Sequence, residues 1–365
     1  MRLAPRSGRP VLWSPFADRS GKMPDDHGRS LHNASQSETD VEICPVGEEG
    51  YEEFVAFLDA GMRPEGASTQ VADDFPVILG ADNLAGMIGI RGDAGWIAGL
   101  AALTRTFTTT AGPVEVAGLG SVVTHPDHRG QGLSSRLQRA MVERLAAAGT
   151  PLAVLWTDQP EIYAGRGFQA AGWEFHLDLG PLASHGSWPP DAGYRPVDGA
   201  AAAADLAALY DRHPLRTRRL AGDHAALYGM PGTTIRALVR DGRIEAFACC
   251  GKGIDFPGYV AEWAGAAMDV LPLLGRVAAE GLATRALVPA GNERFLERAV
   301  AAGAGFAVVP SGLWAVLRPD RLQALCGPVD PGRERDATAW LGEVVAEGEV
   351  RPGRLQVAVW GLDSV

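Results

Sequence analysis

The sequence is poor in cysteine, lacks long apolar runs and has fewer basic than acidic residues. Its 4 cysteines form no C-x-x-C pair, and none stands beside histidine at metal-ligand spacing. Cys249 and Cys250 are adjacent in an apolar run, which predicts buried thiols, no metal site and a reducing, cytoplasmic location. No stretch approaches the about 18 consecutive apolar residues of a membrane-spanning helix. No apolar segment follows the N-terminal arginines as in a secretory signal, so we expect no membrane association.

The charge balance also narrows the classes of partner. The chain has 33 basic and 44 acidic residues, a formal net charge of −11. Nucleic acids and anionic membranes attract positive potential, so we expect neither as a partner. An acidic protein is compatible with a cationic substrate, although many proteins are acidic for solubility alone. The 46% hydrophobic content and the length of 365 residues indicate a globular chain of about two domains.

Periodicity divides the chain into four parts. Residues 1–40 are polar and aperiodic, which predicts a disordered tail, and Met23 is an alternative start. Residues 41–182 run as strand, helix, several antiparallel strands, then strand–helix–strand–helix–strand, which predicts an α/β domain with a mixed sheet. A Pro- and Gly-rich join follows. Residues 192–319 repeat a similar order, with a hairpin expected at Asp241-Gly242. Residues 320–365 are expected to form an arm with a helix in "RDATAWLGEVVAEG" and a terminal strand in "RLQVAVW".

One turn has the composition of an anion site. In "THPDHRGQGLSSRLQ" (124–138), a glycine-spaced turn joins a strand to a helix that we expect to end at Gly149. The first N–H groups of a helix have no intrahelical partners, so such a turn can cradle a phosphate. An ordinary strand–helix loop explains the same residues. A Walker loop would need a lysine here, and a Rossmann fingerprint would open its domain.

The motif Arg129-Gly-Gln-Gly132-Leu-Ser134 resembles motif A of the GCN5-related N-acetyltransferases (GNAT), with pattern Gln/Arg-x-x-Gly-x-Gly/Ala. Ser134 departs from the pattern but is small. "LAVLWTDQPEIYAGRGF" is similar to the strand and helix that follow in that family. The second half repeats the order without the turn. This arrangement resembles the two-domain branch typified by the mycobacterial "enhanced intracellular survival" acetyltransferases. The resemblance implies that the second half is a degenerate copy that forms one wall of the substrate cleft. That branch's third domain has no counterpart of sufficient length after residue 320.

The resemblance implies a GNAT fold and acetyl transfer from acetyl-CoA to an amine of a small or peptidyl substrate. The strand before the turn would hold the pantetheine arm, the turn would hold the diphosphate, and two residues after the next strand would lie beside the cofactor. These cofactor-binding residues are Val122, Val123, Thr124, Arg129, Gly130, Gln131, Gly132, Leu133, Ser134, Ser135, Asp158 and Gln159.

The resemblance also implies a general acid. Tyr163 occupies the matching position, and a phenol can protonate a departing thiolate of similar basicity. Its alternative role is a packed aromatic. The apolar end "VAVWGLDSV" suggests that Val365 docks and that its carboxylate acts as the base, with a plain edge strand as the alternative. Three weaker candidates for the base are Asp363, His125 and Glu262.

Other positions and other functions stay open. His125 and His128 lack a third metal ligand, which favours a loop role, and Trp263 either lines a pocket or packs in a core. Two alternative functions are transfer of a longer acyl group and non-catalytic acetyl-CoA binding by a sensor or interaction protein. The acidic balance slightly favours cationic acceptors such as aminoglycosides or polyamines. The two-domain branch often forms rings, so a homo-oligomer is compatible with the resemblance.

Overall fold

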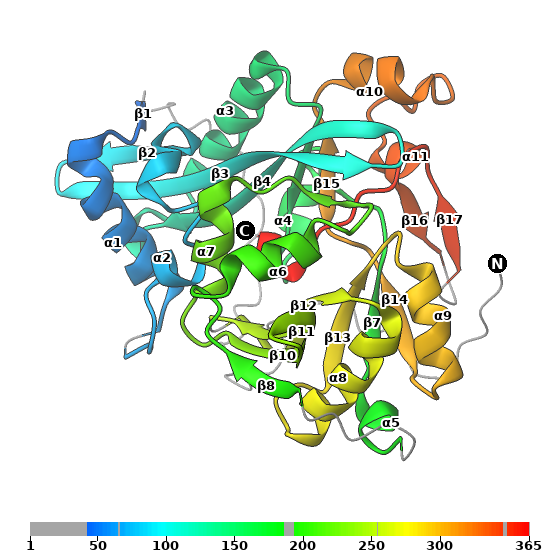
Figure 1. Ribbon diagram of the computed structural model, residues 1–365. Helices are drawn as coiled ribbons and strands as arrows, with labels where there is room; N and C mark the ends of the chain where they lie inside the picture. Colours follow the sequence, from blue (N-terminus) through cyan, green and yellow to red (C-terminus); the bar gives the residue numbers. More distant parts are fainter. Residues whose placement is uncertain (1–41, 65, 186–192, 254, 346–348, 365) are drawn as a thin grey trace, which may run out of the picture.

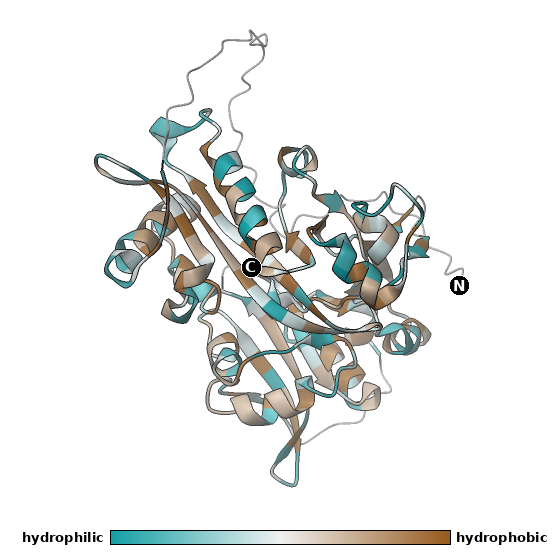
Figure 2. Ribbon diagram, turned by 90° about the horizontal axis from the view of Figure 1, so that it is seen from above, coloured by the Kyte–Doolittle hydropathy of each residue, from teal (hydrophilic) through white to brown (hydrophobic). Residues whose placement is uncertain are grey.

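Two mixed β-sheets covered by helices make up the computed structural model, which describes residues 42–64, 66–185, 193–253, 255–345 and 349–364 (Figure 1). The predicted tail of residues 1–40, including Met23, lies outside these ranges. We call the two sheets with their helices the first and second units. Hydrophobic residues concentrate on the central strands, and hydrophilic ones on the outer helices and loops (Figure 2). In the described ranges no helix is long and apolar enough to cross a membrane.

The first sheet has the order β1-β2-β3-β4-β5-β15-β6, and β9 adds to β3. A single parallel pair, β4 with β5, is joined through helix α3, as the strand–helix–strand order predicts. The strands are β1 (Ile43–Pro45), β2 (Met87–Gly92), β3 (Gly95–Thr109), β4 (Gly112–Thr124), β5 (Leu152–Leu155), β15 (Leu313–Val316), β6 (Gln169–Ala170) and β9 (Arg216–Thr217).

Helices cover both faces of this sheet. On one face, α3 (Leu133–Ala148) buries Leu137 and Met141 against β4 and β5, because its apolar residues recur every four positions. The opposite face is covered at one end by α1 (Tyr51–Met62) and α2 (Val71–Asp74), and at the other by α11 (Ala337–Leu341) and the chain around Leu355. The helix α10 (Pro319–Cys326) also packs at this second end, through Leu322.

The second sheet has the order β14-β7-β13-β12-β11-β10-β8, with β12 and β13 as its parallel pair. Its hairpin turns at Asp241 and Gly242, both at positive φ, as predicted. The strands are β14 (Phe306–Val309), β7 (Glu174–Asp178), β13 (Arg285–Pro289), β12 (Asp255–Gly265), β11 (Arg243–Lys252), β10 (Thr234–Arg240) and β8 (Tyr194–Val197). The helices are α5 (Gly180–Ala183), α6 (Ala203–Tyr210), α7 (Ala221–Tyr228), α8 (Ala267–Ala279) and α9 (Glu293–Ala301).

The two units exchange strands. β15 comes from the second half of the chain but lies between β5 and β6 of the first sheet. In return, β7 comes from the first half and lies between β13 and β14 of the second sheet. Trp314, on β15, is fully buried in the first unit. The contiguous ranges 41–182 and 192–319 therefore each contain a strand of the other unit's sheet.

The C-terminal arm differs from its prediction. The segment "RLQVAVW" is not a strand: Leu355 and Gln356 donate backbone N–H groups to Trp340 and to the Thr110 hydroxyl, so no ladder forms there. The predicted helix stops at Leu341, since Gly342 adopts a φ of 84° and leads into a small hairpin. That hairpin is β16 (Gly342–Val344) with β17 (Val350–Pro352). The chain then reaches the short 3₁₀ helix η5 (Gly361–Asp363) between the two sheets (Figure 1).

We predict that a fragment of residues 42–185 does not fold alone. Without β15, the outer edge of β5 is unpaired and the core loses Trp314, and β7 has no sheet to join. Circular dichroism during urea titration should show no cooperative transition for this fragment. The control is the same cut, between residues 185 and 193, with both pieces coexpressed, which should restore one cooperative transition. A cooperative transition of the isolated fragment would show that the exchange is dispensable.

Candidate active site

The turn before α3 has the geometry of an anion site. The chain leaves β4, passes through the short 3₁₀ helix η3 (Pro126–His128), and enters α3 at Gly132, which adopts a φ of 72°. Gly130 also has a positive φ, of 78°. A Cβ at either glycine would meet no atom within 4 Å, so the backbone conformation rather than lack of space requires glycine. As the N-cap residue, Gly132 has no side chain that could accept from the first N–H groups of α3, so this helix start is suited to an anion.

The predicted residues of this turn lie on its surface, with one exception. Leu133 is buried beneath α3 and belongs to the core. Arg129 is exposed, and its Nε donates to the Thr124 carbonyl oxygen at 3.4 Å. His125 accepts a hydrogen bond from the Asp127 backbone at 3.3 Å. His125 and His128 are therefore loop residues, and no cluster of metal-ligating side chains occurs in the part of the chain that the structure describes.

A cavity opens where β4 and β5 separate, and we call it the donor cavity. The parallel ladder ends at Gly118 and Val154, while β4 continues beside β3 to Thr124. Beyond this point the cavity has a volume of about 290 Å³. Its lining includes Val122, Asp158 and Tyr163, which the sequence had brought together as site residues. Val123, in contrast, faces the opposite side and packs against α1, because neighbouring residues of a strand alternate. Gln159 is exposed outside the lining.

A bulge shapes the wall of the donor cavity. Val123 pairs with Gly99 and Gly120 pairs with Ala101, so Ser121 and Val122 together face a single residue of β3. Ser121 adopts a φ of 52°, which is uncommon for a residue with a side chain. Its hydroxyl is buried, lines the cavity and has no hydrogen-bond partner among the described residues. The sequence motifs did not indicate Ser121, because the bulge is defined by how β4 pairs with β3.

Tyr163 lies on α4 (Glu161–Ala164) with its ring against the Phe168 ring, at 6.3 Å between centroids. Burial raises the pKa of Tyr163; Arg166 opposes this shift and Asp158 adds to it. The phenol therefore stays protonated at neutral pH and can donate a proton inside the cavity.

A second cavity adjoins the first, and we call it the acceptor cavity. It has a volume of about 40 Å³ and lies between the units, on the face of the first sheet opposite α3. The alternating residues Leu103, Arg105 and Phe107 of β3 line it from the first unit. Phe75, Trp156 and Ser364 line both cavities. The two cavities therefore meet at the segment that ends the described chain.

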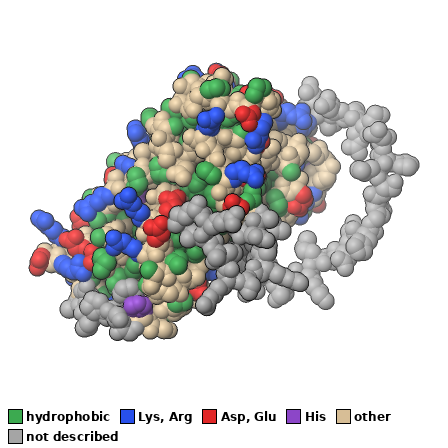
Figure 3. Space-filling model, turned by 90° about the vertical axis from the view of Figure 1, so that its right-hand side faces the viewer, with side chains coloured by type: hydrophobic (Ala, Val, Ile, Leu, Met, Phe, Trp, Pro, Cys, Tyr) green, Lys and Arg blue, Asp and Glu red, His purple; other side chains and the backbone are tan. Residues whose placement is uncertain are grey.

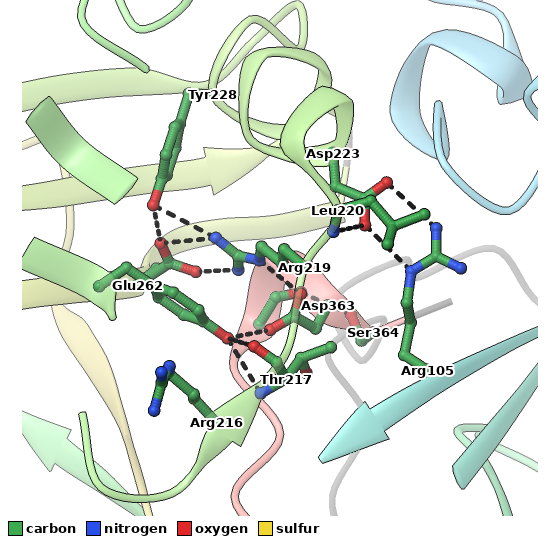
Figure 4. A network of polar contacts seen from close by, with 12 residues as sticks. Arg105, Arg216, Thr217, Arg219, Leu220, Asp223, Tyr228, Glu262, Asp363 and Ser364 are labelled. Carbon is green, nitrogen blue, oxygen red and sulfur yellow. Dashed lines mark hydrogen bonds and ion pairs between the residues drawn. The ribbon is translucent and has the colours of Figure 1, made fainter. Parts of the chain in front are cut away.

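Two buried cations, Arg219 and Lys252, hold that segment in place, and Figure 4 shows the contacts of Arg219. Arg219 donates to Asp363 at 2.7 Å and forms an ion pair with Glu262, with all three side chains at most 5% exposed. Burial alone would lower the pKa of Arg219. The negative charges of Asp363 and Glu262 outweigh this effect and hold the pKa well above its ordinary value. The ammonium group of Lys252 donates to the carbonyl oxygen and hydroxyl of Ser364, and burial lowers its pKa to about 8.

Two of the candidate bases, Glu262 and Asp363, have structural roles in this network. Glu262 and Asp363 are bound by Arg219, and they also accept hydrogen bonds from Tyr228 and Tyr210. Both carboxylates hold the inter-unit contact together. Val365 lies outside the described residues, directly after Ser364.

The second unit has the same strand separation, but aromatic side chains fill it. The β12–β13 ladder ends at Val260 and Ala286, and the Trp263 ring nitrogen then donates to the Leu287 carbonyl oxygen at 2.8 Å. Trp263 stacks on Phe295 with 4.0 Å between ring centroids and contacts Trp360. Of the two roles considered for Trp263, core packing is the one observed.

The first unit matches the family model of the acetyltransferase (GNAT) domain over residues 42–171. Residues 42–171 therefore have the fold of a GNAT domain. The match spans the bulged strand, the glycine turn and Tyr163. Among curated proteins, none matches the chain in sequence.

Solved structures show the same fold beyond the GNAT domain. A probable N-acyltransferase from Enterococcus faecalis V583 is 14% identical, with a TM-score of 0.57 over 76% of this chain and 73% of that chain. A GCN5-related N-acetyltransferase from Anabaena variabilis is 15% identical, with a TM-score of 0.56 over 86% and 85%. Eis1 from Mycobacterium abscessus is 14% identical, with a TM-score of 0.54 over 78% and 76%. These shares extend well past residue 171, so the likeness includes the second unit.

We predict that Gly132→Ala weakens acetyl-CoA binding. An alanine in the left-handed region costs roughly 1–2 kcal/mol and displaces the N–H groups that open α3. Calorimetry should show a rise of the acetyl-CoA dissociation constant by about tenfold, since 1.4 kcal/mol is a factor of ten. Gly149→Ala is the matched control, because Gly149 ends the same helix at a φ of 95°. It should lower the melting temperature similarly without changing affinity. Equal affinities for both variants and the parent would contradict this role.

Proposed function

We propose that the chain is an acetyl-CoA-dependent N-acetyltransferase acting on a small or peptidyl amine. The observation that supports it most is the meeting of the two cavities at Phe75, Trp156 and Ser364, with Tyr163 inside the donor cavity. A thioester that reached the junction through the donor cavity would meet an amine from the other side of the sheet. Holding the thioester and the amine together makes their reaction effectively unimolecular. This is a major source of rate enhancement.

In the proposed reaction, the amine attacks the thioester directly. Its nitrogen forms a bond to the carbonyl carbon, a base takes one proton from that nitrogen, and the carbon–sulfur bond breaks. Tyr163 donates its proton to the departing sulfur and recovers one from solvent. The turn at residues 129–135 would bind the diphosphate, and the bulge at Ser121 and Val122 would bind the pantetheine arm and thioester.

The surface is consistent with an amine acceptor rather than a polyanion. On the face drawn in Figure 3, basic and acidic side chains are interspersed with hydrophobic ones. A binding site for nucleic acid would need a continuous basic patch. Together with the net charge of −11, this arrangement supports a small or peptidyl acceptor.

We predict that Tyr163→Phe lowers kcat by about 10²–10⁴-fold, the usual worth of a general acid. The change keeps the ring contact with Phe168 and removes only the proton donor. Thiol release from acetyl-CoA measures turnover over an amine panel, and calorimetry should give an unchanged acetyl-CoA affinity. Ile162→Ala, on the same helix but 41% exposed, is the control. Full activity of Tyr163→Phe would remove it from the mechanism. Tight acetyl-CoA binding by a parent that turns over no amine would favour a non-catalytic sensor.

For the base, we propose the carboxylate of Val365. Ser364 lines both cavities and is held by Lys252, and Val365 is the residue bonded to it in the sequence. Appending three residues after Val365 should lower kcat by about 10²-fold or more while the melting temperature and acetyl-CoA affinity stay unchanged. Val365→Ala keeps a terminal carboxylate at that position and should retain activity. Unchanged turnover of the extended chain would exclude this base.

A further inference from the structure

The acceptor cavity carries no net charge. Its lining holds three acidic side chains, Asp74, Asp223 and Asp363, and three basic ones, Arg105, Arg219 and Lys252. The remaining lining is mostly apolar, with Phe107 from β3 and Leu227 from α7 among its members. The charged side chains of this lining therefore balance, although the whole chain has a net charge of −11.

The carboxylates of the lining are almost fully engaged within the protein. Arg105 reaches across from β3 and binds both oxygens of Asp223, at 3.0 and 3.1 Å (Figure 4). The two oxygens of Asp363 bind Arg219 and Tyr210. A carboxylate paired in this way has little attraction left for a ligand cation.

One carboxylate oxygen is left over. Asp74 binds Arg63 and Thr69 through Oδ2, at 2.6 and 2.9 Å. Its Oδ1 is buried and has no partner within the described residues. Arg63 nevertheless neutralises Asp74, so each carboxylate of the lining is paired with a cation and an amine would enter the cavity as the uncharged nucleophile. The volume of about 40 Å³ leaves room for roughly three water molecules, which suits a compact molecule.

We propose that the acceptor is a primary monoamine with a compact apolar body, and that Arg105 excludes polycations by neutralising Asp223. This inference rests on the proposed acetyl transfer and names its substrate class. A polyamine or aminoglycoside would bring several ammonium groups into a lining whose three carboxylates are already paired with arginine. Burying these charges without partners is unfavourable, so such acceptors are rejected.

The test compares acceptors on the full chain with acetyl-CoA. Thiol release should give a higher kcat/KM for propylamine, butylamine and isobutylamine than for spermidine and kanamycin, by about tenfold or more. Calorimetry of the same amines with the protein and coenzyme A gives a second readout that needs no turnover, and the order of affinities should be the same. Preference for spermidine or kanamycin in either measurement overturns the proposal. Absence of turnover with every amine, together with tighter binding of the apolar monoamines, would overturn the acetyl transfer and retain the ligand class.

Variants of the ion pair test the role of Arg105. Arg105→Met leaves Asp223 unpaired and should raise the ratio of kcat/KM for spermidine over butylamine by about tenfold. Asp223→Asn leaves Arg105 unpaired and should lower that ratio, since a positive charge then faces the acceptor. The double variant Arg105→Met/Asp223→Asn removes both charges and should return the ratio to the parental value. Ratios unchanged in both single variants, with parental acetyl-CoA affinity showing that they fold, would show that Arg105 does not set specificity.

Discussion

The buried guanidinium of Arg219 joins three separate parts of the chain. It follows strand β9, which pairs with β3 of the GNAT domain, so its backbone is anchored to the first unit. Its side chain binds Glu262 in the centre of the second sheet and Asp363 near the end of the chain. A buried charge that loses its partner typically costs about 3–5 kcal/mol, so each of the three groups holds the others in position. The walls of the acceptor cavity and the location of Ser364 depend on this contact.

The two units share one arrangement of parallel strands but differ in what occupies the gap between those strands. In both, two parallel strands joined by a helix separate beyond their last shared pair. In the GNAT domain, the bulge at Ser121 and the small Gly120 leave the gap open as the donor cavity. In the second unit, the rings of Trp263, Phe295 and Trp360 occupy the corresponding gap. The size of a few side chains, rather than the course of the backbone, separates a binding cavity from a core.

Local patterns in the sequence predicted the parts of the structure that depend on neighbouring residues. Leu137 and Met141 set the buried face of α3 by their spacing, and Asp241-Gly242 set a hairpin by their backbone preferences. The strand exchange depends on pairings between residues more than 100 positions apart, such as Trp314 with Gln169, and periodicity contains no such information. The same holds for Lys252, which follows the apolar run 246–250 of β11 and whose charge becomes meaningful only beside Ser364. Tyr163 and Val122 reached the site by family resemblance, whereas no motif in the sequence singled out Trp156 or Phe75.

The strand exchange has a consequence for how such a chain can change over generations. A duplicated domain that loses its own ligand site is ordinarily free to decay or be deleted. Here the first unit would lose β15 from its own sheet with any deletion of the second half, and β7 would lose its partners. Under the proposed function, selection on the donor cavity therefore also preserves the second unit. Mutations can reshape the cleft between the units, and with it the choice of acceptor, without either half becoming dispensable.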